Sequence, residues 1–365
     1  MKPKIVISGG GTGGHIFPAI AIADELKARY PQAEFLFVGA SNRMEMEKVP
    51  QHGYPIVGLW ISGIQRKLTL DNLMFPFKLL SSLLKARKLL KKFQPHIVIG
   101  TGGFASGPTL KAAVKIGIPT LVQEQNSYAG VTNKWVGKEA TRISVAYENM
   151  QRFFPKDKIR FTGNPVRKGI LESKLTSSES KAKFGIAENT TCVLIIGGSL
   201  GAKRVNEIVH HFIQKHQDKQ LSFIWQTGKF YYENYTSMQA ANCKVMAFIQ
   251  HMEEAYAAAD IIISRAGAGS VSELCLVGKP VIFIPSPNVA EDHQTKNAQA
   301  LVDKDAAICI KESEASEVFE ETLVNLVSDK VLQKKLAMNC KALARPNATK
   351  DIVDEIEQIW NYNNK

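Results

Sequence analysis

Seven residues near the start of the chain, Gly-Gly-Gly-Thr-Gly-Gly-His at 9–15, have the composition to bind an anion and to move a proton. They follow an apolar run at 5–7 and precede apolar residues with helical spacing that begin near Ile16. A glycine loop between a strand and a helix presents backbone N–H groups at the positive helix end, which suits phosphate or diphosphate. Histidine is the side chain that titrates near neutral pH, and His15 would lie beside a bound substrate. The alternative, a tight turn whose glycines serve packing alone, leaves His15 without a role.

The glycines of this loop also satisfy G-x-G-x-x-G, the pattern of a dinucleotide-binding unit. Such a unit places an Asp or Glu at the end of its second strand to hold the ribose. Here the apolar run at 35–38 is followed by Gly-Ala-Ser-Asn at 39–42, which contains no acid. NAD binding is therefore disfavoured, while Arg43 keeps an NADP-dependent oxidoreductase as an alternative.

Two more loops of the first half follow apolar runs directly. Thr-Gly-Gly-Phe-Ala-Ser-Gly-Pro at 101–108 follows the run at 97–99, and Gln-Glu-Gln-Asn at 123–126 follows Leu121-Val122. In a parallel α/β sheet such loops emerge at the carboxyl ends of the strands and face one crevice. The sequence therefore predicts a substrate site formed by these loops and the loop at 9–15.

The second half repeats the pattern after Gly-Asn-Pro-Val-Arg at 163–167, which is typical of a linker between domains. The run at 193–196 predicts a strand, 197–202 is a glycine turn, and 203–217 has the spacing of a helix. This second strand–glycine–helix unit predicts another phosphate site, in which Ser199 can donate a hydrogen bond.

A third such unit lies further along the second half. The strand expected at 261–263 runs into Ser-Arg-Ala-Gly-Ala-Gly-Ser-Val-Ser-Glu at 264–273. The small residues let a ligand approach the backbone, and we expect Ser270 to open a helix with Glu273 in its first turn. Glu273 would then accept both hydroxyls of a ribose. The alternative is a capping box of Ser270 and Glu273 that needs no ligand, although the glycines exceed what capping requires.

Bulk composition sets further bounds. A chain of 365 residues with 45% hydrophobic residues is expected to form two soluble domains, and it contains no apolar run long enough to span a bilayer. The net charge of +12 indicates a polyanionic substrate, an anionic membrane surface or nucleic acid. Nucleic acid is disfavoured because no zinc-finger or RNA-binding signature is present. The scattered cysteines predict buried thiols in a reducing compartment: Cys192, Cys243, Cys275, Cys309 and Cys340.

Residues 69–93 combine a broad apolar stripe with basic side chains and contain no acid between Asn72 and Phe93. A basic amphipathic helix of this kind can lie in the headgroup region of an anionic membrane. The alternative is a helix packed on the sheet with solvated lysines, and both can hold if the end at 73–77 is exposed.

The two similar α/β halves resemble the GT-B architecture of glycosyltransferases, in which two Rossmann-like doubly wound parallel-sheet domains face a central cleft. The motifs are closer still to the MurG family, bacterial transferases that add N-acetylglucosamine to undecaprenyl-pyrophosphoryl-N-acetylmuramoyl-pentapeptide. The resemblance runs in order over nearly the whole chain. It rests on G-G-G-T-G-G-H at 9–15, T-G-G-F-A-S-G-P at 101–108, E-Q-N at 124–126, G-N-P-V-R at 163–167, G-G-S-L-G-A at 197–202, R-A-G-A-G-S-V-S-E at 265–273 and D-H-Q-T-K-N-A at 292–298.

The resemblance implies a division of labour. Residues 1–163 would bind the acceptor and the membrane, with a C-terminal helix at 346–365 packing back on them, and 164–345 would bind the UDP-sugar donor. The lipid tail of the acceptor would run to the membrane around 73–92. The enzyme would be peripheral, at the cytoplasmic face of the cell (inner) membrane.

The resemblance also implies site residues. The donor, UDP-N-acetylglucosamine, would meet Ile249 at its uracil and Glu273 at its ribose, while Ser199 and the 268–270 turn would meet its diphosphate. The other implied donor-binding residues are Thr12, Gly13, Gly14, Asn126, Arg167, Ala268, Gly269, Ser270, Val271, Ser272 and Gln294. The implied acceptor-binding residues are Gly102, Gly103, Ser106 and Gly107. Many family members carry a bulkier residue where this chain has Gly269, which predicts weaker packing on the nucleotide.

Inversion at the anomeric carbon needs a base for the acceptor hydroxyl and stabilisation of the departing UDP. His15 is the candidate base; the alternative is that it only hydrogen-bonds the sugar. A metal-bridged mechanism would place a D-x-D motif in the site, whereas Asp303-Lys304-Asp305 is expected in a solvated turn between a helix and a strand. We therefore predict neither a metal nor a cofactor.

Rival interpretations remain open. Another GT-B enzyme that uses a UDP-sugar, such as a lipid glycosyltransferase or a UDP-N-acetylglucosamine 2-epimerase, would share most of these loops. An epimerase needs no lipid acceptor, so the segments at 69–93 and 101–108 argue against it. A non-enzymatic membrane-surface scaffold would leave the glycine loops unexplained.

Overall fold

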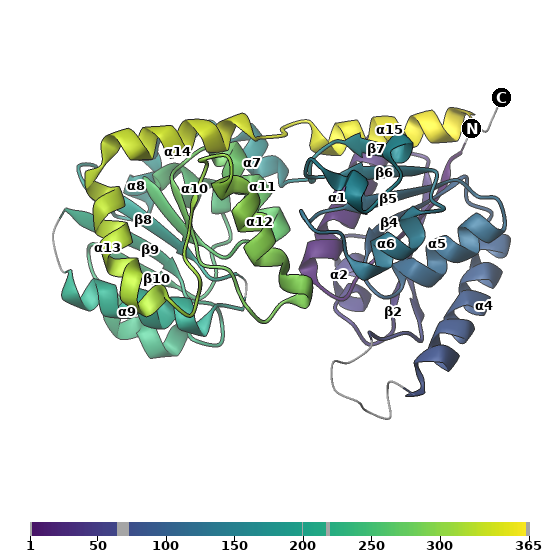
Figure 1. Ribbon diagram of the computed structural model, residues 1–365, viewed down its shortest axis with the longest axis horizontal. Coiled ribbons are helices and arrows are strands. Elements are labelled where there is room, and N and C mark those ends of the chain that lie inside the picture. Colours follow the sequence, from purple (N-terminus) through teal and green to yellow (C-terminus); the bar gives the residue numbers. More distant parts are fainter. Residues whose placement is uncertain (1, 64–72, 199, 217–219, 363–365) are drawn as a thin grey trace. The chain divides into compact units, whose positions relative to one another are not determined.

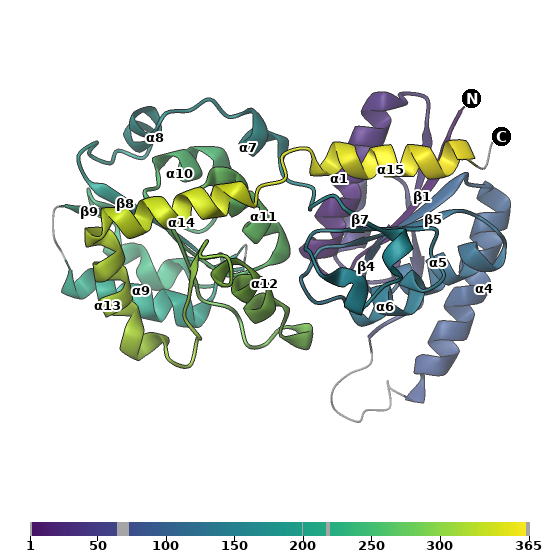
Figure 2. The same cartoon turned by 45° about the horizontal axis from the view of Figure 1, so that its top comes forward.

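Two compact units make up the chain, and each is a parallel sheet covered by helices (Figures 1 and 2). Unit 1 comprises Met1–Val166 and Asn347–Lys365, and unit 2 comprises Arg167–Pro346. The structure is a computed structural model that describes residues 2–63, 73–198, 200–216 and 220–362.

The sheet of unit 1 has seven parallel strands in the order β3-β2-β1-β4-β5-β6-β7. Its central strands are almost uninterrupted apolar runs, because a parallel sheet is covered on both faces. The strands are β1 Lys4–Gly9, β2 Glu34–Ala40, β3 Ile56–Leu59, β4 Ile97–Gly102, β5 Thr120–Glu124, β6 Arg142–Val145 and β7 Ile159–Phe161.

Helices cover both faces of this sheet. Ile5 and Ile7 of β1 point into a core shared with α1 and α15, whereas Val6 points into the opposite core, shared with α4 and α5. This alternation follows from the two-residue repeat of a strand. The helices of unit 1 are α1 Gly13–Arg29, α2 Glu45–Gln51, α4 Phe75–Phe93, α5 Ser106–Lys115, α6 Val131–Gly137 and α15 Ala348–Tyr362.

The last helix, α15, belongs to unit 1 although the chain reaches it only after completing unit 2. Its apolar face adds Ile352, Ile356 and Trp360 to the core beneath α1. Arg29 of α1 pairs with Glu357, and the Tyr30 hydroxyl donates to the same carboxylate at 3.1 Å. The apolar face of the C-terminal helix is thereby buried against α1, which α15 crosses in Figure 2.

Unit 2 has six parallel strands in the order β10-β9-β8-β11-β12-β13. The strands are β8 Thr191–Ile196, β9 Leu221–Gln226, β10 Cys243–Met246, β11 Ile261–Ser264, β12 Val281–Phe283 and β13 Ile308–Cys309. The helices are α7 Lys168–Glu172, α8 Ser177–Lys183, α9 Lys203–Lys215, α10 Met252–Ala258, α11 Ala268–Val277, α12 His293–Val302, α13 Ala315–Ser328 and α14 Lys330–Ala342.

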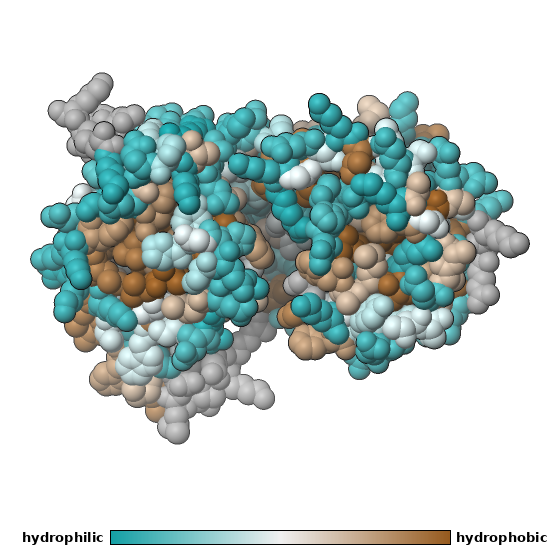
Figure 3. All heavy atoms as spheres, turned by 180° about the vertical axis from the view of Figure 1, so that it is seen from behind, coloured by the Kyte–Doolittle hydropathy of each residue, from teal (hydrophilic) through white to brown (hydrophobic). Residues whose placement is uncertain are grey.

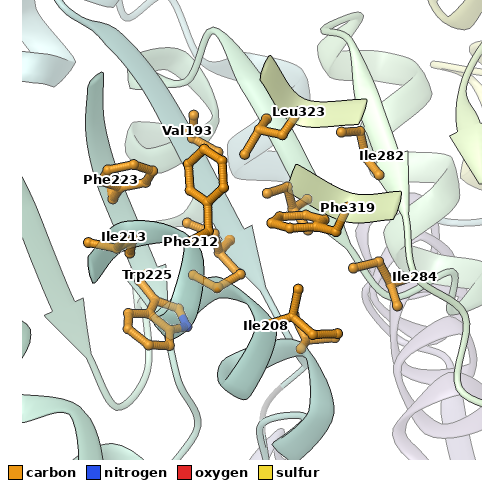
Figure 4. Close-up of a cluster of buried hydrophobic side chains, with 14 of the residues drawn as sticks. Val193, Ile208, Phe212, Ile213, Phe223, Trp225, Ile282, Ile284, Phe319 and Leu323 are labelled. Atoms are coloured by element: carbon orange, nitrogen blue, oxygen red, sulfur yellow. The ribbon is translucent and has the colours of Figure 1, made fainter. Parts of the chain in front are cut away.

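A hydrophobic core of unit 2 lies between the sheet and helices α9 and α13. Figure 4 shows Phe212 of α9 between Phe223 of β9 and Phe319 of α13, with ring centroids 6.3 and 5.8 Å apart. The indole of Trp225 donates to the buried Asn206 of α9 at 3.0 Å. The aromatic packing holds the helices firmly against the strands whose ends carry the candidate site.

Several predicted elements needed correction. Residues 315–342 have the composition of one long helix but form two, because Asp329 leaves helical geometry and caps α14 by accepting from the Leu332 N–H at 2.8 Å. The basic helix begins at Phe75, and the part of the prediction that covers 69–72 lies outside the described residues. Strand β3 and helix α2 were not predicted.

Candidate active site

The loops predicted to form a site in unit 1 do lie at one edge of its sheet. The chain leaves β1 toward β2 on one side and returns to β4 on the other, so β1 and β4 form the topological switch point. Crevices at such points are the usual ligand sites of doubly wound sheets. The loops after β1, β4 and β5 all emerge there.

His15 is where these three loops meet. Its Nδ1 lies 3.0 Å from Oε1 of Gln125, which follows β5. Thr101 of β4 donates its hydroxyl to the His15 carbonyl at 2.8 Å. A Cβ on Gly102 would stand 2.8 Å from His15 Nδ1, so the ring rests directly on the glycine backbone. The predicted meeting of glycine loop, second loop and amide loop is therefore confirmed.

The hydrogen bonds of Gln125 fix the tautomer of His15. The Gln125 amide nitrogen donates to the carbonyl oxygens of Thr101 and Gln123, at 2.8 and 3.0 Å, so its oxygen faces the ring. An amide oxygen can only accept, and Nδ1 must therefore carry the hydrogen. The network assigns the lone pair to Nε2. This arrangement leaves Nε2 able to take a proton from a substrate.

Fewer N–H groups of the glycine loop can bind an anion than the motif indicates. The Gly10 N–H donates to the Gly102 carbonyl at 3.2 Å, and the Gly11 N–H donates to Glu45 at 2.8 Å. Within the described part of the chain, the N–H groups of Thr12, Gly13 and Gly14 meet no acceptor. These three groups at the start of α1 are available to an anion.

The second partner of this loop, Glu45, escaped the sequence analysis. Its side chain is fully buried, and its two oxygens accept from the N–H groups of Gly11 and Ala40, at 2.8 and 2.9 Å. A Cβ on Gly10 would stand 2.2 Å from the carboxylate. The acid missing from 39–42 is thus supplied by α2, but the backbone takes both of its oxygens and a ribose would have to displace those bonds.

The predicted acceptor residues surround the same edge. Gly103 has a φ of +89°, and a Cβ there would stand 2.2 Å from the Gly10 carbonyl oxygen, so only glycine allows the two loops to touch. Ser106 begins α5 and is buried, and its hydroxyl contacts no partner within the described ranges. Gly107 gives room to Trp135.

Asn126 is held in place by a buried acid, Glu124, that was not singled out from the sequence. The carboxylate of Glu124 accepts from the backbone N–H groups of Asn126 and Gly130, both at 3.0 Å, and from the Asn133 amide at 2.9 Å. Carboxylate-to-amide bonds of this kind are strong and rigid. The loop that carries Gln125 and Asn126 is therefore preorganised.

In unit 2 the switch point lies between β8 and β11. A Cβ on Gly201, after β8, would stand 2.0 Å from the Thr227 carbonyl oxygen, so the loops after β8 and β9 are in contact. Arg265 donates to the Ile284 carbonyl at 2.8 Å and pairs with Glu312, which fixes the loop after β11. The predicted diphosphate contact Ser199 lies outside the described residues.

The capping-box interpretation of 270–273 is wrong. Helix α11 begins at Ala268 with Gly267 as its N-cap, so Ser270 is already helical and Glu273 lies in the second turn rather than the first. The N–H groups of Ala268, Gly269 and Ser270 face no acceptor in the described structure. Helix α11 thus offers an anion site like that of α1.

Glu273 is buried and already held by two side chains. Its Oε1 lies 2.9 Å from Nε of Arg167, and its Oε2 accepts from the Tyr256 hydroxyl at 3.1 Å. Burial raises the pKa of Glu273, while Arg167 and Tyr256 act against that rise by stabilising the charged form. Two of the roughly four acceptor positions of the carboxylate are in use.

The remaining predicted donor residues differ in how accessible they are. Ile249 is buried, and its N–H donates to Gln226 at 2.8 Å. Gln294, near the start of α12, accepts from the Ser286 N–H at 2.9 Å. Val271 points into the core, and the Ser272 hydroxyl donates to the Ala268 carbonyl at 3.1 Å. The buried side chain of Val271 therefore helps to anchor α11 in unit 2 through packing.

Two negative findings concern the described residues alone. No three His, Cys, Asp or Glu side chains among them gather so as to hold a metal ion. A cavity of about 450 Å³ opens near the amino-terminal end of β8, between Lys181, Lys279 and Lys334, and none of the predicted site residues lines it. This cavity is therefore separate from the switch-point loops that carry the predicted site residues.

Helix α4 presents two different faces. Ala86 and Leu90 pack into the core of unit 1, while Leu73, Phe77, Leu80 and Leu84 form an exposed stripe at helical spacing. Figure 3 shows apolar residues exposed among polar ones on the surface of unit 1. The C-terminal half of the stripe is basic, with Lys88 and Lys91 exposed. No described helix is long and apolar enough to cross a membrane.

Comparison with known proteins agrees with this geometry. Residues 5–145 match the model of the glycosyltransferase family 28 N-terminal domain, and residues 192–356 match that of the C-terminal domain. Together with two doubly wound parallel sheets, these matches define a glycosyltransferase of family 28 with the GT-B fold.

Full-length relatives narrow the class. The UDP-N-acetylglucosamine–N-acetylmuramyl-(pentapeptide) pyrophosphoryl-undecaprenol N-acetylglucosamine transferases of Christiangramia forsetii and Flavobacterium psychrophilum are each 56% identical to this chain, covering 98% of it and 98% and 97% of themselves. The crystal structure of Acinetobacter baumannii MurG matches with a TM-score of 0.80 and 30% identity over 98% of this chain and all of its own. The chain belongs to the MurG family.

A more distant likeness concerns the fold alone. The UDP-GlcNAc 2-epimerase of Neisseria meningitidis, solved with UDP-GlcNAc bound, has a TM-score of 0.67 but only 17% identity, over 98% of this chain and all of its own. The epimerase therefore has the same architecture as this chain, but its sequence is far less similar to this chain than the sequences of the MurG relatives are.

Proposed function

We propose that this protein is an inverting glycosyltransferase that moves N-acetylglucosamine from UDP-N-acetylglucosamine to the 4-hydroxyl of undecaprenyl-pyrophosphoryl-N-acetylmuramoyl-pentapeptide. The product is the lipid-linked disaccharide of peptidoglycan synthesis. The observation that carries the proposal is the end-to-end match, at 56% identity, to relatives named for this transfer.

Unit 2 binds the donor in this proposal. The N–H groups at the start of α11 face the diphosphate, and each helix terminus supplies roughly half an elementary charge of the right sign. Glu273 accepts from the ribose hydroxyls, and Ile249 borders the uracil. Arg167 and Gln294 close on the nucleotide sugar.

Unit 1 binds the acceptor and supplies the base. Nε2 of His15 takes the proton of the acceptor hydroxyl. The hydroxyl oxygen bonds to the anomeric carbon of N-acetylglucosamine as the bond between that carbon and the UDP oxygen breaks. The negative charge on departing UDP is met by the α11 N–H groups. The support for the base role is the hydrogen bond from Nδ1 to Gln125, which directs the lone pair to Nε2.

The enzyme works at an anionic membrane surface, and we place it at the cytoplasmic face of the inner membrane. The exposed stripe of α4 supports this, because leucines and phenylalanine at its start can enter the headgroup region while Lys88 and Lys91 meet lipid phosphates. The membrane then holds the lipid tail of the acceptor next to unit 1.

The reaction is tested by transfer of labelled N-acetylglucosamine from UDP to a short-chain lipid I analogue in the presence of EDTA. Labelled disaccharide product is expected. If UDP raises the melting temperature but no product forms, the acceptor is wrong and another UDP-sugar enzyme of this fold is indicated. A response to NADPH in place of UDP would contradict the proposal and favour the oxidoreductase.

Membrane binding is tested by flotation with phosphatidylglycerol vesicles. Replacing Leu80 and Leu84, which are 58% and 60% exposed, by Ser should weaken binding markedly. Val331→Ser, at an 81% exposed position of unit 2, is the matched control and should bind like the unaltered protein. Equal binding to neutral phosphatidylcholine vesicles would contradict the role of the basic half of the stripe.

A further inference from the structure

Tyr256 is a side chain of unit 2 to which the proposed reaction gives no role. It lies on α10, its side chain is buried, and its hydroxyl donates to Glu273 at 3.1 Å. A buried hydroxyl without a partner is costly, so this bond is retained whenever the unit is folded. Tyr256 is therefore a fixed partner of the Glu273 carboxylate.

The other partner of Glu273 is different in kind. The Arg167 side chain is 57% exposed, whereas that of Glu273 is 8% exposed. Exposed ion pairs are weak and exchange readily with water or ligand. One oxygen of the Glu273 carboxylate is thus bound by the buried Tyr256, and the other is bound by Arg167, which solvent can reach.

The location of α10 links two parts of the donor site. The helix begins at Met252, three residues after Ile249, whose N–H is tied to Gln226. The bond from Tyr256 to Glu273 crosses from this segment to α11. A substitution at Tyr256 would therefore affect the carboxylate of Glu273, the proposed ribose contact, although Tyr256 itself does not contact the nucleotide in the proposal.

We infer that Tyr256 is a positioning residue that holds the Glu273 carboxylate in the orientation that accepts both ribose hydroxyls of a uridine nucleotide. The inference rests on the proposed donor site in unit 2. With one oxygen fixed by Tyr256, each oxygen of Glu273 keeps an acceptor position for a hydroxyl. Without that bond the carboxylate rotates toward Arg167 and loses its alignment.

The test compares the affinity of UDP with those of 2′-deoxy-UDP and 3′-deoxy-UDP by calorimetry. A hydrogen bond to a charged acceptor predicts that the unaltered protein prefers UDP by about 10-fold to 100-fold over each analogue. Tyr256→Phe keeps the ring and removes the donor. It should weaken UDP and leave the analogues nearly unchanged, so that the preference falls by at least roughly threefold.

Three further variants make the result specific. Tyr235→Phe alters a buried tyrosine of the same unit that packs on Trp225, and it should keep the full preference. Glu273→Gln should reduce the preference, and adding Tyr256→Phe to it should cause little further loss, because the two residues act as one unit.

A merely structural role would lower the melting temperature of Tyr256→Phe and leave the preference for UDP intact; that result, with the preference lost in Glu273→Gln, would overturn the inference. Preference retained in both variants would contradict the ribose role of Glu273 as well. UDP binding by the unaltered protein without sugar transfer would contradict only the proposed reaction, since these affinities need no acceptor.

Discussion

Glu45 in unit 1 and Glu273 in unit 2 are both buried carboxylates beside switch-point loops, and they are held in opposite ways. In unit 1 both oxygens of Glu45 accept from backbone N–H groups, those of Gly11 and Ala40. In unit 2 both oxygens of Glu273 are held by side chains, those of Arg167 and Tyr256. The N–H groups that hold Glu45 can turn away only if the main chain moves, whereas the half-exposed side chain of Arg167 can turn away from Glu273.

The difference assigns the two carboxylates different tasks. Glu45 fixes the shape of the glycine loop, and it explains why a loop with the dinucleotide pattern has no acid to offer a ribose. Glu273 keeps acceptor positions that a ligand can reach. The same kind of sheet edge therefore holds His15 rigidly in unit 1 and, in the proposed reaction, binds the nucleotide in unit 2.

The largest expected effect separates chemistry from binding. His15→Ala should lower kcat by about 10²-fold to 10⁴-fold, the usual contribution of a general base, while the UDP affinity of unit 2 stays unchanged. The exposed His52→Ala is the control in the same unit. Loss of less than about fivefold in kcat would reduce His15 to a sugar contact.

The orientation of His15 gives the next test. Gln125→Met keeps the length of the side chain and removes both the oxygen that meets Nδ1 and the N–H groups that meet Thr101 and Gln123. We expect kcat to fall by roughly tenfold or more, as one hydrogen bond of about 1–2 kcal/mol predicts, with the KM of the donor unchanged. A change confined to the KM of the donor would contradict the tautomer assignment.

Glu45→Gln tests the rigid side of the comparison. Glutamine offers only one acceptor, so one of the buried N–H groups of Gly11 and Ala40 loses its partner. The free energy of unfolding should fall by about 1–3 kcal/mol. Glu47→Gln, at an exposed position of α2, should change it little.

Alkylation of the cysteines shows whether Glu45→Gln destabilises unit 1 alone, because all five cysteines lie in unit 2. Burial raises the pKa of Cys192 to about 12 and that of Cys243 to about 11, so both stay protonated until unit 2 opens. Their alkylation rates at pH 8 should be the same in Glu45→Gln and the unaltered protein. Faster alkylation would mean that the two units unfold together.

The raised pKa of Glu273 predicts a pH dependence with a definite sign. Folded protein binds this proton more tightly than the unfolded chain, so the unfolded chain carries fewer protons between the ordinary value of 4.5 and the raised one. The contribution of Glu273 to the free energy of unfolding must therefore decrease as pH rises through that window. Urea unfolding of the unaltered protein and of Glu273→Gln should be compared from pH 4 to 7. The difference between their free energies of unfolding should shrink as the pH rises. A difference that stays constant would contradict the raised pKa of Glu273.

The smallest expected effect concerns Gly269. A Cβ there would meet nothing within 4 Å, and the residue lies in the first turn of α11. Gly269→Ala should therefore stabilise unit 2 by about 0.5–1 kcal/mol through the unfolded state, with an increase in melting temperature. A decrease would show that the glycine is needed for the helix to start.

Local patterns predicted much of this structure. The strand–glycine–helix units at 9–15 and 264–273 were recognisable because a loop and the elements beside it are continuous in sequence. Glu45, Gln125 and Tyr256 were missed because each acts through a contact with a different loop or helix, 17 to 110 residues away. The start of α11 was misplaced because Gly267 took the N-cap position that Ser270 was expected to fill.

The most direct test of the account is the affinity of UDP for the unaltered protein, His15→Ala and Glu273→Gln, measured by calorimetry under one set of conditions. The account predicts an unchanged Kd for His15→Ala and a Kd raised by roughly tenfold or more for Glu273→Gln, the loss of hydrogen bonds to a charged group. A raised Kd for His15→Ala with an unchanged Kd for Glu273→Gln would contradict it, because the nucleotide would then bind in unit 1.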